Sequence, residues 1–170
     1  NVSNVSLGFR KLFAGKRKAF DLSGWVFSAD ADLSGMFMGS DCGHHNMRVD
    51  KPLLWNLFYW DTSNVINMSH MFKGAIFHDN IKKWDVSNVR YMNGMFEDNK
   101  KFYQDISNWD LSNVIDMSRM FCGAIDFMYF ENLNLEKWQS QIDERRKDPR
   151  NKILTTDMFK GWGKKRLTEI

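Results

Sequence analysis

The segment Trp84-Asp85-Val86-Ser87-Asn88-Val89 decides the fold, because near-copies of it stand at 60–65 and 109–114. We call this segment the first phrase. Its opening tryptophan recurs at intervals of 24 and 25 residues. Each copy leads into a second phrase that ends in Met-Phe, at 71–72, 95–96 and 120–121. A repeat of this length is typical of a solenoid, in which each unit buries its apolar side only against its neighbours.

Six units align on the phenylalanine that ends the second phrase: Phe13, Phe37, Phe72, Phe96, Phe121 and Phe159. Two of the intervals are long, and insertions at about 40–53 and 139–151 account for them. Insertions in a repeat protein map to loops on one flank. The sequence therefore predicts a single repeat domain over 1–170. Because Asn1 enters in the middle of a phrase, we interpret the chain as a piece of a longer protein.

The two phrases predict different backbone conformations. The stretch into each tryptophan reads apolar-x-x-Trp-x-apolar, as in 81–86, so Trp and the residue two later point the same way, as in a strand. The second phrase places Val, Met and Met-Phe at i, i+3, i+6 and i+7, which favours a helical turn or a 3-10 segment. We expect a mainly β, right-handed solenoid of about six coils with one short parallel strand per coil.

Two local signals refine this expectation. Glycine follows the phenylalanine by two residues in five units, where a left-handed residue ends a helical turn, and Asp98-Asn99 stands there in the remaining one. In the last unit, Leu135, Trp138 and Ile142 suit a helix through about 139–148 that Pro149 stops.

Composition excludes several classes of protein. The 170 residues are 43% hydrophobic and 15% aromatic, which is too apolar for a disordered tail. A net charge of +3 without a concentrated basic patch gives no reason to expect nucleic acid as a partner. No apolar run approaches the roughly 20 residues that span a bilayer, so we expect no membrane insertion by this segment. Cys42 and Cys122 are too few for a disulfide framework.

The sequence carries no enzyme signature, and we expect neither catalysis nor a cofactor. A phosphate-binding glycine loop, Gly-x-Ser-x-Gly and His-Glu-x-x-His are all missing. Only the segment 41–45, Asp-Cys-Gly-His-His, resembles metal chemistry, and common zinc motifs need two ligand pairs at set spacings. His70 and His78 could approach it only if this loop folds back. No metal site is predicted, and a metal-dependent hydrolase built on His44 and His45 is the least favoured alternative.

Residues that flank the tryptophans form the candidate binding face. The residues before Trp vary between units, and variable outward positions on a constant frame carry specificity in repeat proteins. Asp61, Asp85 and Asp110 follow Trp directly, and in register they would form an acidic column. The alternative for these carboxylates is local: each accepts from a backbone N–H two or three residues on, in an Asx turn. The candidate partner-binding residues are Tyr59, Asp61, Lys83, Asp85, Asn108 and Asp110.

The motif resembles a known group of repeats. Phe102 to Val114 followed by Met117 to Gly123 is similar to the roughly 25-residue units of BspA-like, leucine-rich-repeat surface proteins, especially those of mycoplasmal and Gram-positive lipoproteins. The resemblance is strong over 57–125, recognisable at 5–39 and degraded at 133–162. It implies a leucine-rich-repeat-like solenoid on a protein exported to the cell surface, and it implies no catalytic residues.

These observations together predict a non-enzymatic, monomeric protein-binding module of a bacterial surface or secreted protein, which binds an unidentified protein through its exposed strand face. The alternative is a structural spacer, or stalk, that carries another functional domain. A binding module depends on the variable outward residues, whereas a spacer tolerates their replacement.

Overall fold

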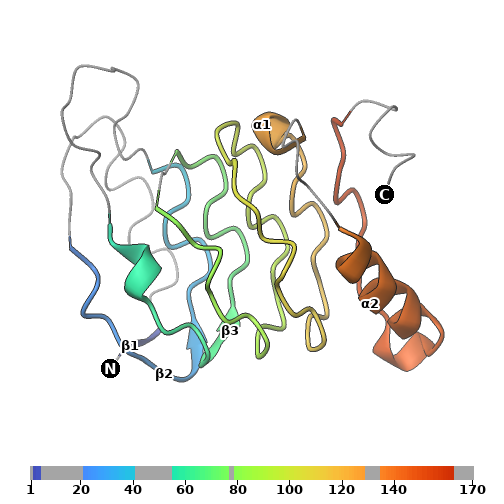
Figure 1. Ribbon diagram of the computed structural model, residues 1–170, viewed down its shortest axis with the longest axis horizontal. Coiled ribbons are helices and arrows are strands. Elements are labelled where there is room, and N and C mark those ends of the chain that lie inside the picture. Colours follow the sequence, from blue (N-terminus) through green and yellow to red (C-terminus); the bar gives the residue numbers. More distant parts are fainter. Residues whose placement is uncertain (1, 5–20, 41–54, 77–78, 129–134, 163–170) are drawn as a thin grey trace.

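The computed structural model describes residues 2–4, 21–40, 55–76, 79–128 and 135–162 (Figure 1). Successive repeats lie side by side along the long axis of the molecule, and the helix α2 lies near the C-terminal end. The regular elements are short: strands β1 (Val2–Asn4), β2 (Phe27–Asp32) and β3 (Val65–Asn67), 3-10 helices η1 (Leu57–Tyr59) and η2 (Pro149–Asn151), and helices α1 (Ile125–Met128) and α2 (Glu136–Arg146).

Parallel pairing links one repeat to the next. β2 lies between β1 and β3 in a three-stranded parallel sheet. Single parallel bridges continue this pairing from Asn67 to Tyr91, from Tyr91 to Asp116 and from Asp116 to Leu154. Each repeat from β2 onward thus adds one short extended segment to a ladder that runs the length of the described stack.

The extended segments lie where the first phrase passes into the second, as β3 does at Val65–Asn67, and the prediction that they lead into tryptophan was wrong. Before each tryptophan the chain makes a turn, in which the Trp N–H donates to the carbonyl three residues earlier, as from Trp84 to Ile81 at 3.1 Å. Before Trp60 this turn is the 3-10 helix η1. The apolar-x-x-Trp spacing therefore reflects a tight turn that places both apolar side chains inward, because positions three apart in such a turn face the same way.

The second phrase carries most of the backbone bonds between repeats. The N–H groups of Met68, His70, Phe72 and Gly74 donate to the carbonyls of Tyr91, Asn93, Met95 and Glu97 at 2.8–2.9 Å. The same four positions link the repeats on either side in the same way. The N–H groups between them close turns within their own repeat, such as Met71 to Met68 at 3.2 Å. Backbone N–H groups of the second phrase thus alternate between bonds within their own repeat and bonds to the next repeat.

Left-handed residues four apart keep the second phrase from becoming a helix. The pairs with positive φ are Gly35 and Gly39, His70 and Gly74, Gly94 and Asp98, Arg119 and Gly123, and Asp157 and Gly161. An α-helix needs consecutive right-handed residues, so the predicted helical turn is instead a series of separate turns. In the repeat without the second glycine, Asp98 takes the left-handed position, while Asn99 is buried and its amide donates to the Phe72 carbonyl at 3.3 Å.

Stacked aromatic rings fill the core. The phenylalanines that end the second phrase form a column from Phe37 to Phe159, with ring centroids 5.4–5.8 Å apart and ring planes within 8° of parallel. Trp60 stacks on Trp84 at 5.8 Å in a second column. The methionines of the second phrase are buried beside these rings, where flexible thioethers fill irregular space.

Helix α2 takes the place of the first phrase in the last repeat. It covers Glu136–Arg146, a start three residues earlier than predicted, and its first turn includes Trp138. Trp138 and Ile142 are buried, and the Trp138 ring stacks 6.1 Å from Phe121. Gln141 accepts from the Leu111 N–H at 2.7 Å, so the helix is bonded to the preceding repeat. No helix in the described segments is long and apolar enough to cross a membrane.

Removing one ring from either column tests this core. We expect Trp84→Ala and Phe96→Ala each to lower the free energy of unfolding by about 3–5 kcal/mol, because each leaves a cavity among stacked rings. The Phe96 ring lies between the rings of Phe72 and Phe121, and its centroid is 3.9 Å from that of Phe102. Replacement of the exposed Tyr103 by alanine serves as the control. Chemical denaturation provides the measurement, and a midpoint unchanged in either variant would contradict the assignment.

Candidate functional site

All six residues of the predicted binding face are exposed. Tyr59 ends η1, while Lys83 and Asn108 lie in the turns before their tryptophans. Asp61, Asp85 and Asp110 follow the tryptophans directly. The face is therefore built from turns, and its description as a strand face needs correction. The buried tryptophans between these residues hold the turns in place, because their rings belong to the core.

An aromatic pair and a lysine make the most distinctive part of this face. Phe58 and Tyr59 are 39% and 67% exposed, and their rings meet edge to face with centroids 5.4 Å apart. Lys83 from the next repeat places its Nζ 5.0 Å from the centre of the Phe58 ring, within the range of a cation–π contact. We call Phe58, Tyr59 and Lys83 the aromatic–lysine patch. Sequence analysis selected Tyr59 and Lys83 and missed Phe58, which the aromatic run before Trp60 could have indicated.

The aspartates of the face are engaged in local turns. Asp61, Asp85 and Asp110 each accept from the backbone N–H of the serine two residues later, at 2.9–3.1 Å. The hydroxyl of Ser63 also donates to Asp61 at 2.6 Å, and this bond is the main cause that lowers the pKa of the Asp61 carboxyl. The pKa of Asp110 is lowered in the same way by Ser112. The local alternative considered for these carboxylates thus describes their observed contacts.

The asparagines of the first phrase bind the preceding repeat. The amides of Asn64, Asn88 and Asn113 donate to main-chain carbonyls of Phe27, Ser63 and Ser87 at 3.2, 2.8 and 2.7 Å. These bonds give carbonyls of the preceding repeat a hydrogen-bond donor. The same corner forms a polar groove of about 300 Å³, lined by Ala29, Asp30, Ser63, Asn64, Ile66, Asn88, Arg90 and Asn113.

A buried carboxylate lies on another flank of the stack. Glu97 is 3% exposed and accepts from Lys73 Nζ at 2.8 Å and from Arg119 Nε at 3.0 Å. Arg119 and Lys160 both reach Asp157, at 3.5 and 3.1 Å. We call Lys73, Glu97, Arg119, Asp157 and Lys160 the ionic strip, which joins four consecutive repeats. Burial alone would raise the pKa of Glu97, but the Arg119 and Lys73 bonds outweigh it and lower that pKa.

His70 borders the ionic strip in an unusual setting. Its backbone is left-handed, and a Cβ on Gly94 would lie 2.3 Å from its Nδ1, so the ring needs a glycine there. Asn93 lies 3.3 Å from Nε2, and because the Asn93 oxygen already accepts from Ser69, the amide is assigned as the donor to a neutral ring. Burial is the main cause that lowers the pKa of His70, and the Lys73 charge adds to it.

Metal chemistry finds no support in the described part of the chain. The segment 41–45, including His44 and His45, and the residue His78 lie outside the described residues, as does Cys42. Cys122 is a buried free thiol. Across the described ranges, no group of three or more His, Cys, Asp or Glu side chains is placed to hold a metal ion.

Glu97→Gln tests the ionic strip. We expect the variant to lose about 1–3 kcal/mol of stability at pH 7, because charge-assisted bonds to Lys73 and Arg119 are replaced by weaker ones. The folded-state pKa of Glu97 is lowered, so this stability is present above the ordinary glutamate pKa and is lost as pH falls through the folded value. Chemical denaturation from pH 7 to pH 3 should show the two proteins converge, whereas exposed Glu144→Gln should follow the wild type throughout.

His70→Asn tests the neutral imidazole. Asparagine tolerates the left-handed backbone, so we expect a small change in stability at pH 7. Because burial lowers the folded-state pKa, the unfolded chain binds the proton first as pH falls below about 6.5, and the wild type loses stability there. The difference in unfolding free energy between wild type and variant should therefore shift in favour of the variant between pH 7 and pH 5. A constant difference over that range would contradict a neutral, half-buried His70.

Comparison with known proteins identifies the family. A family model described as "Mycoplasma protein of unknown function, DUF285" matches residues 44–148, more than half of the chain and most of the aromatic stack. The comparison with curated proteins and the comparison with solved structures each gave no match. The matched range includes the aromatic–lysine patch, the Asx turns of Asp61, Asp85 and Asp110, and the first three residues of the ionic strip, Lys73, Glu97 and Arg119. The chain therefore belongs to the family of Mycoplasma proteins of unknown function, DUF285.

Proposed function

We propose that this chain is a non-enzymatic protein-binding module, built as a leucine-rich-repeat-like right-handed solenoid. The observation that carries the proposal is the aromatic–lysine patch. Phe58 and Tyr59 expose large rings on a turn whose next residue, Trp60, is locked in the core. Aromatic side chains held in place lose little conformational freedom on binding, which is why they dominate the energetics of protein interfaces.

The charges around the patch favour a protein partner over a small molecule. Lys83 lies over one ring, and Asp61 and Asp85 occupy neighbouring repeats. Mixed charges around exposed rings resemble the polar rim and apolar centre of an interface. The surface is also made by several repeats, so a partner would bind across units rather than in one pocket.

A spacer is the second candidate, and the Asx turns favour it. Asp61, Asp85 and Asp110 already accept bonds from their own serines, so part of the face is occupied by the fold itself. A chain that served only to separate other domains would need these turns and would make no use of Phe58 and Tyr59.

A surface variant separates the two candidates. Tyr59→Ser, Lys83→Ser and Asp85→Asn are combined, with asparagine keeping an acceptor for the turn at Asp85. The control combines Glu144→Ser and Lys147→Ser, an exposed pair on α2. Cross-linking capture from host and bacterial surface fractions identifies a partner, and biolayer interferometry on the purified pair then measures affinity.

We expect the triple variant to bind that partner at least tenfold more weakly, a loss of about 1.4 kcal/mol, at an unchanged melting temperature. The control should bind as tightly as the wild type. Equal affinity of all three proteins for every captured partner would leave the spacer as the better account.

We further propose that the module belongs to a bacterial surface or secreted protein. This rests on the resemblance of its repeats to those of exported lipoproteins. Antibody labelling of intact cells tests it, because a protein in the cell interior would be labelled only after the membrane has been permeabilised.

A further inference from the structure

The polar groove crosses four consecutive repeats, from β2 to the repeat that contains Asn113. Its volume of about 300 Å³ lies at the lower end of the range for small-molecule sites. Pairing between repeats fixes the backbone beneath it: the Ala31 N–H donates to the Asn64 carbonyl at 3.1 Å, and the Arg90 N–H donates to the Ile66 carbonyl at 2.9 Å. A ligand in this groove would therefore meet a surface whose main chain is already in place.

Amide oxygens of the asparagines form a row of acceptors in this groove. Asn64, Asn88 and Asn113 each direct the side-chain nitrogen at a main-chain carbonyl, at 3.2, 2.8 and 2.7 Å. Because a carbonyl only accepts, the nitrogen must face it, and the amide oxygen is left to accept from another group. No donor among the described residues bonds to these three oxygens. Asparagines of neighbouring repeats are about one strand spacing apart, roughly 4.8 Å.

Two opposite charges also line the groove. Arg90 stands where the neighbouring repeats have Ile66 and Ile115, and Asp30 of β2 lines the groove two repeats away. Both side chains are exposed, and neither has an ion-pair or hydrogen-bond partner within the described part of the chain. An acid and a base with hydrogen-bond acceptors between them favour a ligand that carries both charges.

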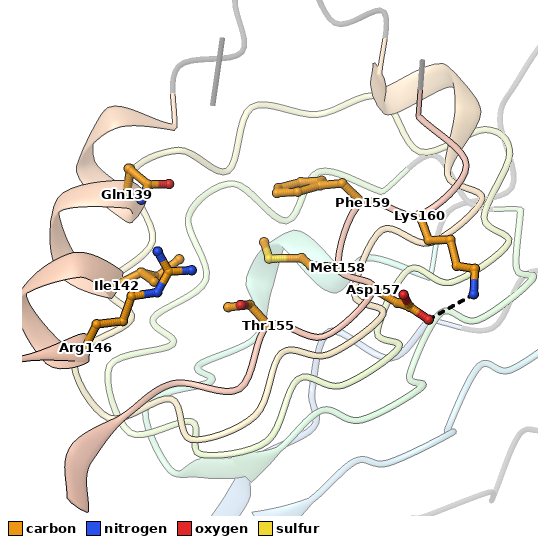
Figure 2. Close-up of a pocket in the computed structure, with 8 residues that line it drawn as sticks. All are labelled: Gln139, Ile142, Arg146, Thr155, Asp157, Met158, Phe159 and Lys160. Atoms are coloured by element: carbon orange, nitrogen blue, oxygen red, sulfur yellow. Dashed lines mark hydrogen bonds and ion pairs between the residues drawn. The ribbon is translucent and has the colours of Figure 1, made fainter. Parts of the chain in front are cut away.

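Charges in the groove beside α2 are arranged differently (Figure 2). That groove has a volume of about 480 Å³ and lies between α2 and the last repeat. Its Arg146 pairs with Asp143 at 2.9 Å, and its Lys160 pairs with Asp157 at 3.1 Å. These charges already bind one another, whereas Asp30 and Arg90 remain open to a ligand.

The separation of the two charges selects the length of the ligand. Asp30 and Arg90 belong to repeats two steps apart, which places them about 10 Å apart along the stack. A free amino acid carries its ammonium and carboxylate on one carbon atom, so it is too short to reach both. An extended tripeptide reaches about 10 Å. A neutral sugar would leave both charges unmatched, and Asp30 would repel the phosphates of a nucleic acid.

We propose that the polar groove binds a short extended oligopeptide, about three residues long, with free ends. Its ammonium pairs with Asp30, its carboxylate pairs with the Arg90 guanidinium, and its N–H groups donate to the amide oxygens of Asn64 and Asn88. Ile66 contributes apolar lining, so a small apolar side chain fits in the middle of the peptide. The small volume favours a free peptide over a loop of a larger protein. This site is separate from the aromatic–lysine patch, and the proposal does not rest on the function proposed above.

Titration of the whole 170-residue chain with trialanine tests the proposal. The readout is the shift of NMR signals, which detects the weak binding expected of exposed charges. We expect saturable shifts at millimolar peptide for Asn64, Asn88 and Arg90. N-acetylated and C-amidated trialanine each lack one charge and should bind about two- to fivefold more weakly. The variant with substitutions in and beside the aromatic–lysine patch should bind trialanine as the wild type does, which separates this site from that surface.

Two variants assign each charge to one end of the peptide. Arg90→Gln should weaken the binding of trialanine about two- to fivefold and leave the affinity for the amidated peptide unchanged. Asp30→Asn should weaken the binding of trialanine to a similar extent and leave the affinity for the acetylated peptide unchanged. Asparagine tolerates the left-handed backbone at Asp30, where φ is 59°. Lys83→Gln removes an exposed charge outside the groove and serves as the control.

Three results would overturn the proposal. The first is the absence of saturable shifts in the groove at the highest millimolar concentrations of trialanine. The second is a variant, Arg90→Gln or Asp30→Asn, that weakens the free and the matching capped peptide equally or weakens neither. The third is binding of a doubly capped Lys-Ala-Glu peptide as tight as that of trialanine, which would make a segment of a larger protein the occupant.

Discussion

Backbone pairing between repeats is the constraint on which the rest of the structure depends. Four N–H groups in each second phrase donate to carbonyls of the next repeat. This pairing fixes the register, so residues at equivalent positions of successive repeats lie side by side. The phenylalanine column follows from that register, since each ring is placed over its counterpart at 5.4–5.8 Å. A slip of one residue would point the phenylalanines outward and leave buried donors unpaired, and both changes are costly.

The same pairing explains why non-glycine residues occupy strained positions. His70, Arg119 and Asp157 have φ near +55° to +60°, a conformation that costs an ordinary residue about 1 kcal/mol or more. The backbone bonds on either side leave no alternative at this position. Arg119 offsets part of the cost by bonding to Glu97, which ties the strained residue to the preceding repeat. Two residues of the ionic strip, Arg119 and Asp157, thus also occupy left-handed positions.

Repeat stacking, the buried rings and the helix in the last unit could be predicted from the sequence, because each depends on residue period and apolar character. The position of the extended segments could not be read in this way. Trp84 and Val86 are both buried with Asp85 exposed between them, which is the burial pattern of a strand, yet the Trp84 N–H closes a turn. Burial alternation reports which way side chains face, whereas strand pairing depends on where backbone donors find partners in another repeat. The ionic strip was missed for a related reason. Lys73 and Glu97 hold the same repeat position with opposite charges, and Arg119 lies two residues before its phenylalanine, so no repeated residue type marks the strip.

Polar groups at the repeated positions already form hydrogen bonds within the stack, so few of them remain for a partner to bind. The asparagines bind the previous repeat, and the aspartates bind their own serines. Features available for recognition therefore lie where the pattern is broken. Phe58 and Tyr59 stand where other repeats have small or polar residues before tryptophan, and α2 replaces a first phrase. In a repeat protein of this kind, departures from the period are where partner specificity should be sought, because the constant residues are already engaged in joining one repeat to the next.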